Sequence, residues 1–175
     1  MDLGHKGKTV IISGGSKGIG AGISEVFAQE GANLVINYHR NREACLEFAG
    51  YLSEHYGIRT AAVQGDVGKE EDVAAIFDCA IQNFGQVDIL VNNAGRGVSK
   101  KFTDITLEDW NQCLNDNLTG QFLMSREFAR RVIPAKRRGW IVNILSKASC
   151  TSTTKGRVCY VCNKSGETGL THSLA

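Results

Sequence analysis

A glycine-rich turn between an apolar strand and an amphipathic helix is the feature that most restricts how this chain can fold. Ser13 to Gly20 reads Ser-Gly-Gly-Ser-Lys-Gly-Ile-Gly, and the apolar run from Thr9 to Ile12 precedes it. A strand, a glycine turn and a helix in this order present backbone amides at a helix N-terminus, where they bind a dinucleotide pyrophosphate. The helical pattern predicts one buried face, made of Ile19, Ile23, Val26 and Phe27.

The glycines of this turn have different physical roles. Gly14 allows the tight turn, Gly18 lets the backbone approach a phosphate, and Gly20 lets the helix pack closely on the sheet. The spacing differs from G-x-G-x-x-G, because three residues separate Gly14 from Gly18, and no Gly-Lys-Ser/Thr follows as in a P-loop. A glycine turn is also common as a plain connection, so the turn alone leaves the nucleotide site open.

Strand and helix patterns alternate along the chain, which predicts βαβ units and a parallel sheet. Between the strands, helical stripes of apolar residues end at Gly31, Gly57 and Gly85. Thr106 and Asp109 have the spacing of a helix cap, and the helix is expected to run to Ile133. A Ser/Thr-rich loop then leads to a last helix from about Tyr160. The other strands are expected at Asn33–Asn37, Thr60–Val63, Val87–Val91 and Trp140–Leu145.

Composition fits one ordered domain over residues 1–175 and points to no charged polymer as a partner. The net charge is +2, and the basic cluster Arg130 to Arg138 falls at a predicted helix end, where cations complement the helix dipole. We therefore expect no nucleic-acid partner. The N-terminus lacks the apolar core of a signal peptide and no apolar run has membrane-spanning length, so we expect a cytoplasmic protein with no membrane contact. The 6 cysteines are then expected to be reduced, and no metal site is expected.

The end of the second predicted strand bears on which dinucleotide would bind. An acid at this position typically binds the ribose hydroxyls of NAD, whereas a basic residue accommodates the extra phosphate of NADP. The sequence here is Asn37-Tyr38-His39-Arg40, without an acid, and Lys17 lies in the glycine turn. Two charge-assisted contacts of about 1.5–3 kcal/mol each give a preference of a hundredfold or more. We predict NADP as the preferred cofactor with NAD possible, unless Arg40 and Lys17 are only solvated surface cations.

A tyrosine and a lysine near the C-terminus have the spacing of an acid–base pair. Tyr160 and Lys164 are four residues apart, so they lie one above the other on a helix face. A phenol is a poor base at neutral pH, and a cation about 4 Å away at an effective dielectric near 20 favours its ionised form by about 4 kcal/mol. A lone Y-x-x-x-K pair occurs by chance in many chains. It is more specific here because Asn143 to Ser146 precede it at the end of a buried strand.

Together these motifs resemble the short-chain dehydrogenase/reductase family over nearly the whole chain. The likeness is carried by the glycine turn, by Asp66, by Asn92-Asn93-Ala94-Gly95, by Asn117 in Asn-Leu-Thr-Gly, and by Ser146, Tyr160 and Lys164. It is a general similarity to bacterial 3-oxoacyl-(acyl carrier protein) reductases and glucose dehydrogenases. The resemblance implies an α/β fold with a doubly wound parallel sheet, the Rossmann fold, in three layers.

The resemblance also implies roles for individual residues. Ser146 would bind the carbonyl oxygen, with Ser149 a second candidate, Tyr160 would exchange the proton, Lys164 would support Tyr160 and bind the ribose, and Asn117 would hold a water that reprotonates the lysine. It further implies a homodimer or homotetramer with apolar surface at Phe122, Phe128, Val132 and Ile133, part of which could be core. The cofactor contacts it implies are Ser13, Gly14, Ser16, Lys17, Gly18, Ile19, Gly20, Arg40, Asp66, Val67, Asn93, Ala94, Gly95, Tyr160 and Lys164.

Two departures from the family pattern limit what can be carried over. Leu145-Ser146-Lys147 replaces the usual Ser-Ser-small run, and Lys147 adds a charge near the expected substrate. The sequence also lacks the sixth strand, substrate loop and seventh strand that follow in the family, so the expected sheet lacks its last strands. The fifth strand would then be an open apolar edge. We interpret the chain as a fragment or as a truncated product.

Three hypotheses for the function remain. The first is an NADP-dependent oxidoreductase that transfers a hydride between nicotinamide and a small ketone or secondary alcohol. The second is an inactive nucleotide-binding or oligomerising remnant, favoured by the missing substrate wall. The third is a thiol redox protein that uses Cys159 and Cys162, although these residues flank the better-explained Tyr160.

Overall fold

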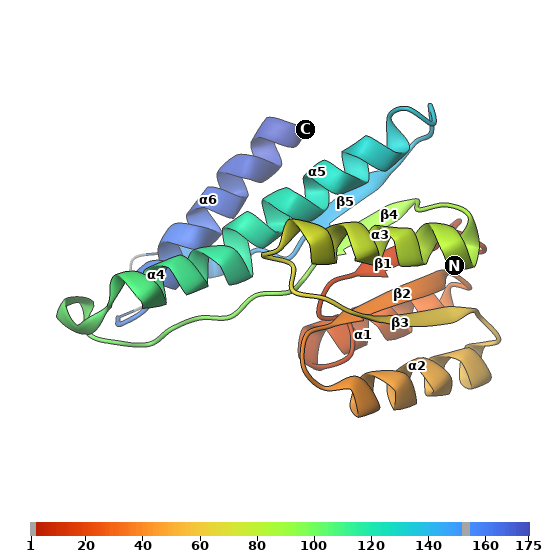
Figure 1. The fold of residues 1–175 in the computed structure, drawn as a ribbon, viewed down its shortest axis with the longest axis horizontal. Helices are drawn as coiled ribbons and strands as arrows, with labels where there is room; N and C mark the ends of the chain where they lie inside the picture. Colours follow the sequence, from red (N-terminus) through yellow and green to blue (C-terminus); the bar gives the residue numbers. More distant parts are fainter. Residues whose placement is uncertain (1–2, 152–154) are drawn as a thin grey trace.

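The strands form one parallel five-stranded sheet, as the alternating pattern predicted (Figure 1). The computed structural model describes residues 3–151 and 155–175, so the middle of the expected Ser/Thr-rich loop lies outside the described residues. The strand order is β3-β2-β1-β4-β5, and the chain reverses its direction of winding between β1 and β4. Ligands of such sheets bind beyond the carboxyl ends of the strands at this point. The strands are β1 (Thr9–Ile12), β2 (Asn33–Tyr38), β3 (Thr60–Gln64), β4 (Ile89–Asn92) and β5 (Trp140–Asn143).

Helices cover both faces of the sheet and complete a three-layer α/β/α fold (Figure 1). On one face lie α1 (Gly18–Gln29) and α2 (Arg42–Tyr56), and on the other α3 (Glu70–Phe84) and α5 (Gly120–Val132). α4 (Leu107–Leu114) precedes α5 in the same helical rod, and α6 (Val158–Leu174) packs along α4. Short turns complete the chain: η1 (Phe102–Asp104), the π-helical η2 (Asn115–Thr119) and η3 (Lys147–Ser149).

Strand β1 separates two hydrophobic cores because its side chains alternate between the faces of the sheet. Val10 and Ile12 pack with α1 and α2, whereas Ile11 packs with α3 and α5, and all three are fully buried. A strand buried on both faces reads as a continuous apolar run, which explains the pattern from Thr9 to Ile12. The outer strand β5 is less covered, since Trp140 and Val142 are both more than 40% exposed.

The predicted buried face of α1 is partly wrong. Ile19 is 69% exposed and Val26 is 54% exposed, whereas the fully buried positions are Gly20, Ser24 and Ala28. The helix lies so close to the glycine turn that a Cβ atom on Gly20 would be 2.5 Å from Asn93 Nδ2. Small residues therefore form the contact face, and the larger residues Ile23 and Phe27 pack at its sides.

The long helix expected from Thr106 to Ile133 is interrupted. Its start is as predicted, because Thr106 and Asp109 form a reciprocal capping box at the N-terminus of α4. Five residues of π-helix, Asn115 to Thr119, then separate α4 from α5. Such widened turns are frequently found at functional sites, and this one contains Asn117.

None of the helices in residues 3–151 and 155–175 is both long and apolar enough to cross a membrane.

Two glycines in α1 provide a matched test of the close helix–turn packing. Gly20→Ala should lower the free energy of unfolding by about 1–3 kcal/mol, because the added methyl overpacks a rigid contact. Gly22→Ala on the same helix, where nothing lies within 4 Å of an added Cβ, should raise it by about 0.5–1 kcal/mol. Urea unfolding measures both values. Equal effects of the two substitutions would contradict this packing argument.

Candidate functional site

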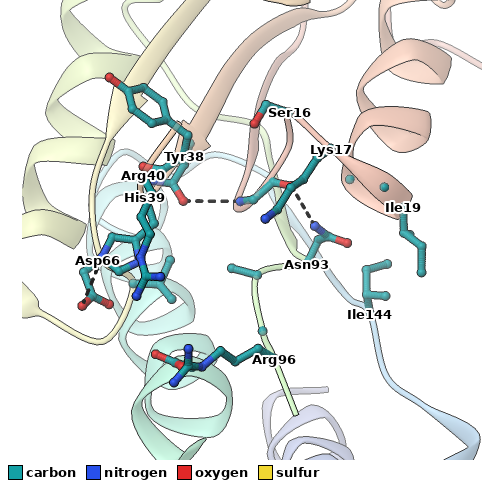
Figure 2. A pocket seen from close by; sticks show the side chains of 18 of the residues that line it. Ser16, Lys17, Ile19, Tyr38, His39, Arg40, Asp66, Asn93, Arg96 and Ile144 are labelled. Carbon is teal, nitrogen blue, oxygen red and sulfur yellow. Dashed lines mark hydrogen bonds and ion pairs between the residues drawn. The ribbon is translucent and has the colours of Figure 1, made fainter. Parts of the chain in front are cut away.

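A pocket of about 730 Å³ opens at the carboxyl ends of the strands, at the point where the winding reverses (Figure 2). Its walls come from the glycine turn, the ends of β2 and β3, the loop after β4, and α6. All of the cofactor contacts expected from the sequence line this pocket, with the exception of Ser13. The structure therefore brings together residues from Gly14 to Lys164 that are far apart in the chain.

Ser13 lies behind the pocket and joins two of its walls. It is 2% exposed, and its Oγ accepts hydrogen bonds from the backbone N–H groups of Asn93 and Ala94, each at 3.0 Å. Asn93 returns the contact, because its Nδ2 donates to the carbonyl oxygens of Ser13 (3.0 Å) and Gly14 (3.1 Å). These bonds fix the glycine turn against the loop after β4.

The glycine turn leaves a helix N-terminus open toward the pocket. Gly14 and Gly18 have φ values of 61° and 54°, in the left-handed region that favours glycine. The N-cap residue of α1 is Lys17, and its side chain makes no hydrogen bond to the first amides of the helix. Gly18 has open space around its Cα, so a ligand atom can approach the backbone there. Free amides, the helix dipole and this open space fit the pyrophosphate of a dinucleotide.

Asn37 is a pocket residue to which the sequence analysis gave no structural role. It is 2% exposed, its Nδ2 donates to the Gly65 carbonyl oxygen at 3.0 Å, and its Oδ1 accepts from the Gly14 N–H at 3.4 Å. One amide thus links the glycine turn to the ends of β2 and β3. The signal for this role in the sequence was a polar residue, Asn37, at the end of a predicted apolar strand.

Basic side chains line the pocket near the end of β2. Lys17, His39 and Arg40 are exposed and line the pocket, and His39 Nε2 lies 4.0 Å from Asp66 Oδ2 (Figure 2). Within the part of the chain that the structure describes, no ion pair joins Lys17 or Arg40 to an acid. Asp66 Oδ1 is occupied by the Gly68 N–H at 2.9 Å, which orders the turn after β3.

A second charged group in the pocket was missed in the sequence. Arg96 Nε lies 2.6 Å from Asp116 Oδ2, and Gln112 Nε2 donates to the other oxygen of Asp116 at 2.7 Å. These residues connect the loop after β4 to α4 and to the π-helical turn. Arg96 directly follows Gly95, so its position next to the recognised motif was the signal.

Tyr160 and Lys164 both lie on α6 and line the pocket. Lys164 Nζ lies 5.8 Å from the centre of the Tyr160 ring. Gly97 packs on this ring, since a Cβ atom there would be 3.4 Å from Tyr160 Cδ2. Lys164 Nζ donates to the Ile144 carbonyl oxygen just beyond β5, whereas Arg40 follows β2, so these two residues lie on opposite sides of the glycine turn that follows β1.

Two other expected catalytic residues contact backbone and lie outside the pocket lining. Asn117 is buried, and its Nδ2 donates at 2.7 Å to the carbonyl oxygens of Arg96 and Cys113. Ser146 is half-buried, and its Oγ accepts from the Ala148 N–H at 3.2 Å. Ser149 Oγ donates to the Ser146 carbonyl oxygen at 2.8 Å. Both positions remain predictions as catalytic groups.

The cysteines in the structure are free thiols. Cys159 is buried and Cys162 is exposed. Burial raises the pKa of the Cys45, Cys79 and Cys113 thiols, which makes them less reactive. Among the described residues no group of three or more His, Cys, Asp or Glu side chains could hold a metal ion.

Comparison with known proteins identifies the family. The model of the short chain dehydrogenase family matches residues 8–175. This chain belongs to the short-chain dehydrogenase family. It is 42% identical over 141 residues to 3beta-hydroxysteroid dehydrogenase 1 of Eggerthella lenta, covering 81% of this chain and 54% of that protein. It is 34% identical over 175 residues to the 3-oxoacyl-(acyl-carrier-protein) reductase of Aquifex aeolicus, covering 100% of this chain and 69% of that protein.

The fold of the family is equally clear from solved structures. The NADPH-dependent 3-quinuclidinone reductase of Rhodotorula rubra superposes with a TM-score of 0.91 at 27% identity, covering 98% of this chain and 64% of that chain. The doubly wound Rossmann fold implied by the resemblance is thus confirmed. The chain spans about half the length of the first curated relatives, 54% in both cases.

Proposed function

We propose that the chain carries the cofactor-binding and catalytic residues of an NADP-dependent oxidoreductase that interconverts a small ketone and a secondary alcohol. The observation that carries this proposal is the single pocket that has Lys17 and Arg40 at one end and Tyr160 and Lys164 at the other. Relatives named as a hydroxysteroid dehydrogenase and a 3-oxoacyl reductase support the reaction class, and the NADPH-dependent quinuclidinone reductase supports the cofactor.

Different residues of the chain bind the cofactor and transfer the proton. The amides at the N-terminus of α1 hold the pyrophosphate, and Lys17 and Arg40 neutralise the 2′-phosphate. A bound nicotinamide supplies or accepts the hydride. Tyr160 donates its proton to the carbonyl oxygen during reduction and accepts it during alcohol oxidation. Ser146 Oγ accepts from the Ala148 N–H, which leaves its hydroxyl proton to donate to that oxygen, and the ammonium of Lys164 places a positive charge next to the Tyr160 ring.

The cofactor preference is testable by charge reversal. NADPH should bind about a hundredfold more tightly than NADH, and the gap should narrow in high salt because Lys17 and Arg40 are exposed. Arg40→Asp should weaken NADPH binding by about tenfold or more and move the preference toward NADH. Fluorescence titration measures the affinities of the parent protein and of Arg40→Asp for NADPH and for NADH. Arg42→Asp, a charge reversal of an exposed neighbour outside the pocket, is the control and should change little. Equal affinities for both nucleotides would exclude NADP selectivity.

The proposed proton donor is testable by removal of one hydroxyl. Tyr160→Phe should abolish NADPH oxidation by an acetoacetyl thioester while NADPH affinity stays nearly unchanged, because the ring and its packing remain. Because the chain spans 54% of its first curated relatives, the assay uses a version extended by the C-terminal part of such a relative. Tyr51→Phe, on the exposed face of α2, is the matched control. Turnover that survives Tyr160→Phe would identify a different proton donor. NADPH binding without turnover in the parent protein would favour the nucleotide-binding remnant.

We also propose that the chain associates with copies of itself as a dimer or tetramer. Of the four apolar residues considered for this role, Phe128 and Val132 belong to the core, whereas Phe122 is 44% and Ile133 is 72% exposed. These two exposed side chains on and just after α5 support a contact along that helix. Sedimentation at micromolar concentration should show a species of at least twice the chain mass. A monomer under these conditions would overturn the proposal.

A further inference from the structure

A buried carboxyl group lies directly behind the lysine of the pocket. Glu167 is on α6, three residues after Lys164, and its Oε2 lies 2.7 Å from Lys164 Nζ. Their side chains are only 3% and 8% exposed, respectively. Lys164 lines the pocket, whereas Glu167 is not part of the lining. The Glu167 carboxyl group therefore contacts the Lys164 ammonium on the side that faces away from the pocket.

Lys164 is the polar partner that compensates this carboxyl group. Among the described residues, Glu167 Oε1 has no hydrogen-bond partner. Burial raises the pKa of Glu167, and the charge and hydrogen bond of Lys164 oppose that rise. Removing water from an acid costs free energy unless a partner compensates it, so an acid at residue 167 has no packing advantage over an apolar side chain. Holding Lys164 in place is a physical reason for an acid at this residue.

The contacts of the ammonium define its direction. An ammonium group has three N–H donors. One donates to the Ile144 carbonyl oxygen at 2.9 Å and a second donates to Glu167 Oε2 at 2.7 Å. The third N–H is left for the pocket, where the Tyr160 ring centre lies 5.8 Å from Nζ. The two acceptors, one just after β5 and one on α6, thus determine the direction of the third N–H of Lys164.

We propose that Glu167 is a positioning residue for Lys164, whose carboxyl group holds the ammonium at the inner end of the pocket with one N–H free for a bound nucleotide or for Tyr160. The effect on nucleotide binding and on Tyr160 rests on the proposed function, whereas the contact between Glu167 and Lys164 is present in the protein without cofactor. Glu167 touches neither substrate nor cofactor and acts only through Lys164.

Three substitutions separate the hydrogen bond from the negative charge and from packing. Glu167→Gln retains an acceptor of similar size without the charge. Glu167→Leu removes both the acceptor and the charge and places an apolar side chain of similar size at the same buried position, which leaves the Lys164 ammonium without its carboxylate partner. Glu127→Leu is the matched control, because Glu127 is also a largely buried carboxylate in an ion pair, with Arg131 on α5 and outside the pocket.

The first readout is the Nζ–H signal of Lys164 in lysine-labelled protein without cofactor, assigned by its loss in Lys164→Arg. Hydrogen bonds within the protein slow the exchange of these protons with water, so the parent protein and Glu127→Leu should show the signal near neutral pH. Glu167→Gln should retain it, and Glu167→Leu should lose it. An unchanged signal in Glu167→Leu would overturn the positioning role.

The second readout is NADPH affinity in a double-mutant cycle. Glu167→Leu should weaken NADPH binding by about tenfold, the value of one hydrogen bond to a charged group, with Glu167→Gln in between. In a Lys164→Met background the same substitution should have no further effect, because the residue it positions is gone. Equal weakening in both backgrounds would show a merely structural role and overturn the proposal. If the parent protein binds no NADPH, the proposed function fails, and the Nζ–H signal alone decides the positioning role.

Discussion

The pocket depends on the reciprocal hydrogen bonds between Ser13 and Asn93. Ser13 Oγ accepts from two amides of the loop after β4, and Asn93 Nδ2 donates to two carbonyl oxygens of the glycine turn. The sheet alone aligns β1 and β4, but it does not fix the loops beyond their ends. The side chains of these two residues do so, because each hydrogen-bonds two part-buried backbone groups of the opposite segment. Gly20 can then pack against the same junction.

Charge is distributed unevenly along the pocket. Where β2 ends, exposed Lys17 and Arg40 are free to bind an anion, and solvent screens them. At the other end, Lys164 is almost fully enclosed and is held by Glu167 and the Ile144 carbonyl oxygen. The first arrangement suits recognition of a phosphate that arrives from solvent. The second keeps a cation in a fixed place next to a phenol, as acid–base chemistry requires.

Sequence periodicity was more reliable for the sheet than for helix contacts. Each expected strand exists, and Gly57 and Gly85 end α2 and α3 in the left-handed conformation that their sequence position suggested. The exposed positions of Ile19 and Val26 show the limit of the argument. Periodicity assumes that the largest apolar residues face the sheet, but a very short distance between α1 and the glycine turn admits only small residues there.

The order of the elements, the glycine turn and the pairing of Tyr160 with Lys164 can be read from the sequence, because each of these depends on residues close together in the chain. Which polar groups are buried, and what they contact, follows only from how the elements pack in three dimensions. Asn37 joins three chain segments, Arg96 pairs with Asp116, and Glu167 lies behind Lys164 with almost no exposure. The spacing of Glu167 is visible in the sequence, but its lack of solvent is not. Burial depends on how α6 packs against the rest of the fold, and burial is what turns an ordinary helix-surface ion pair into a candidate positioning device.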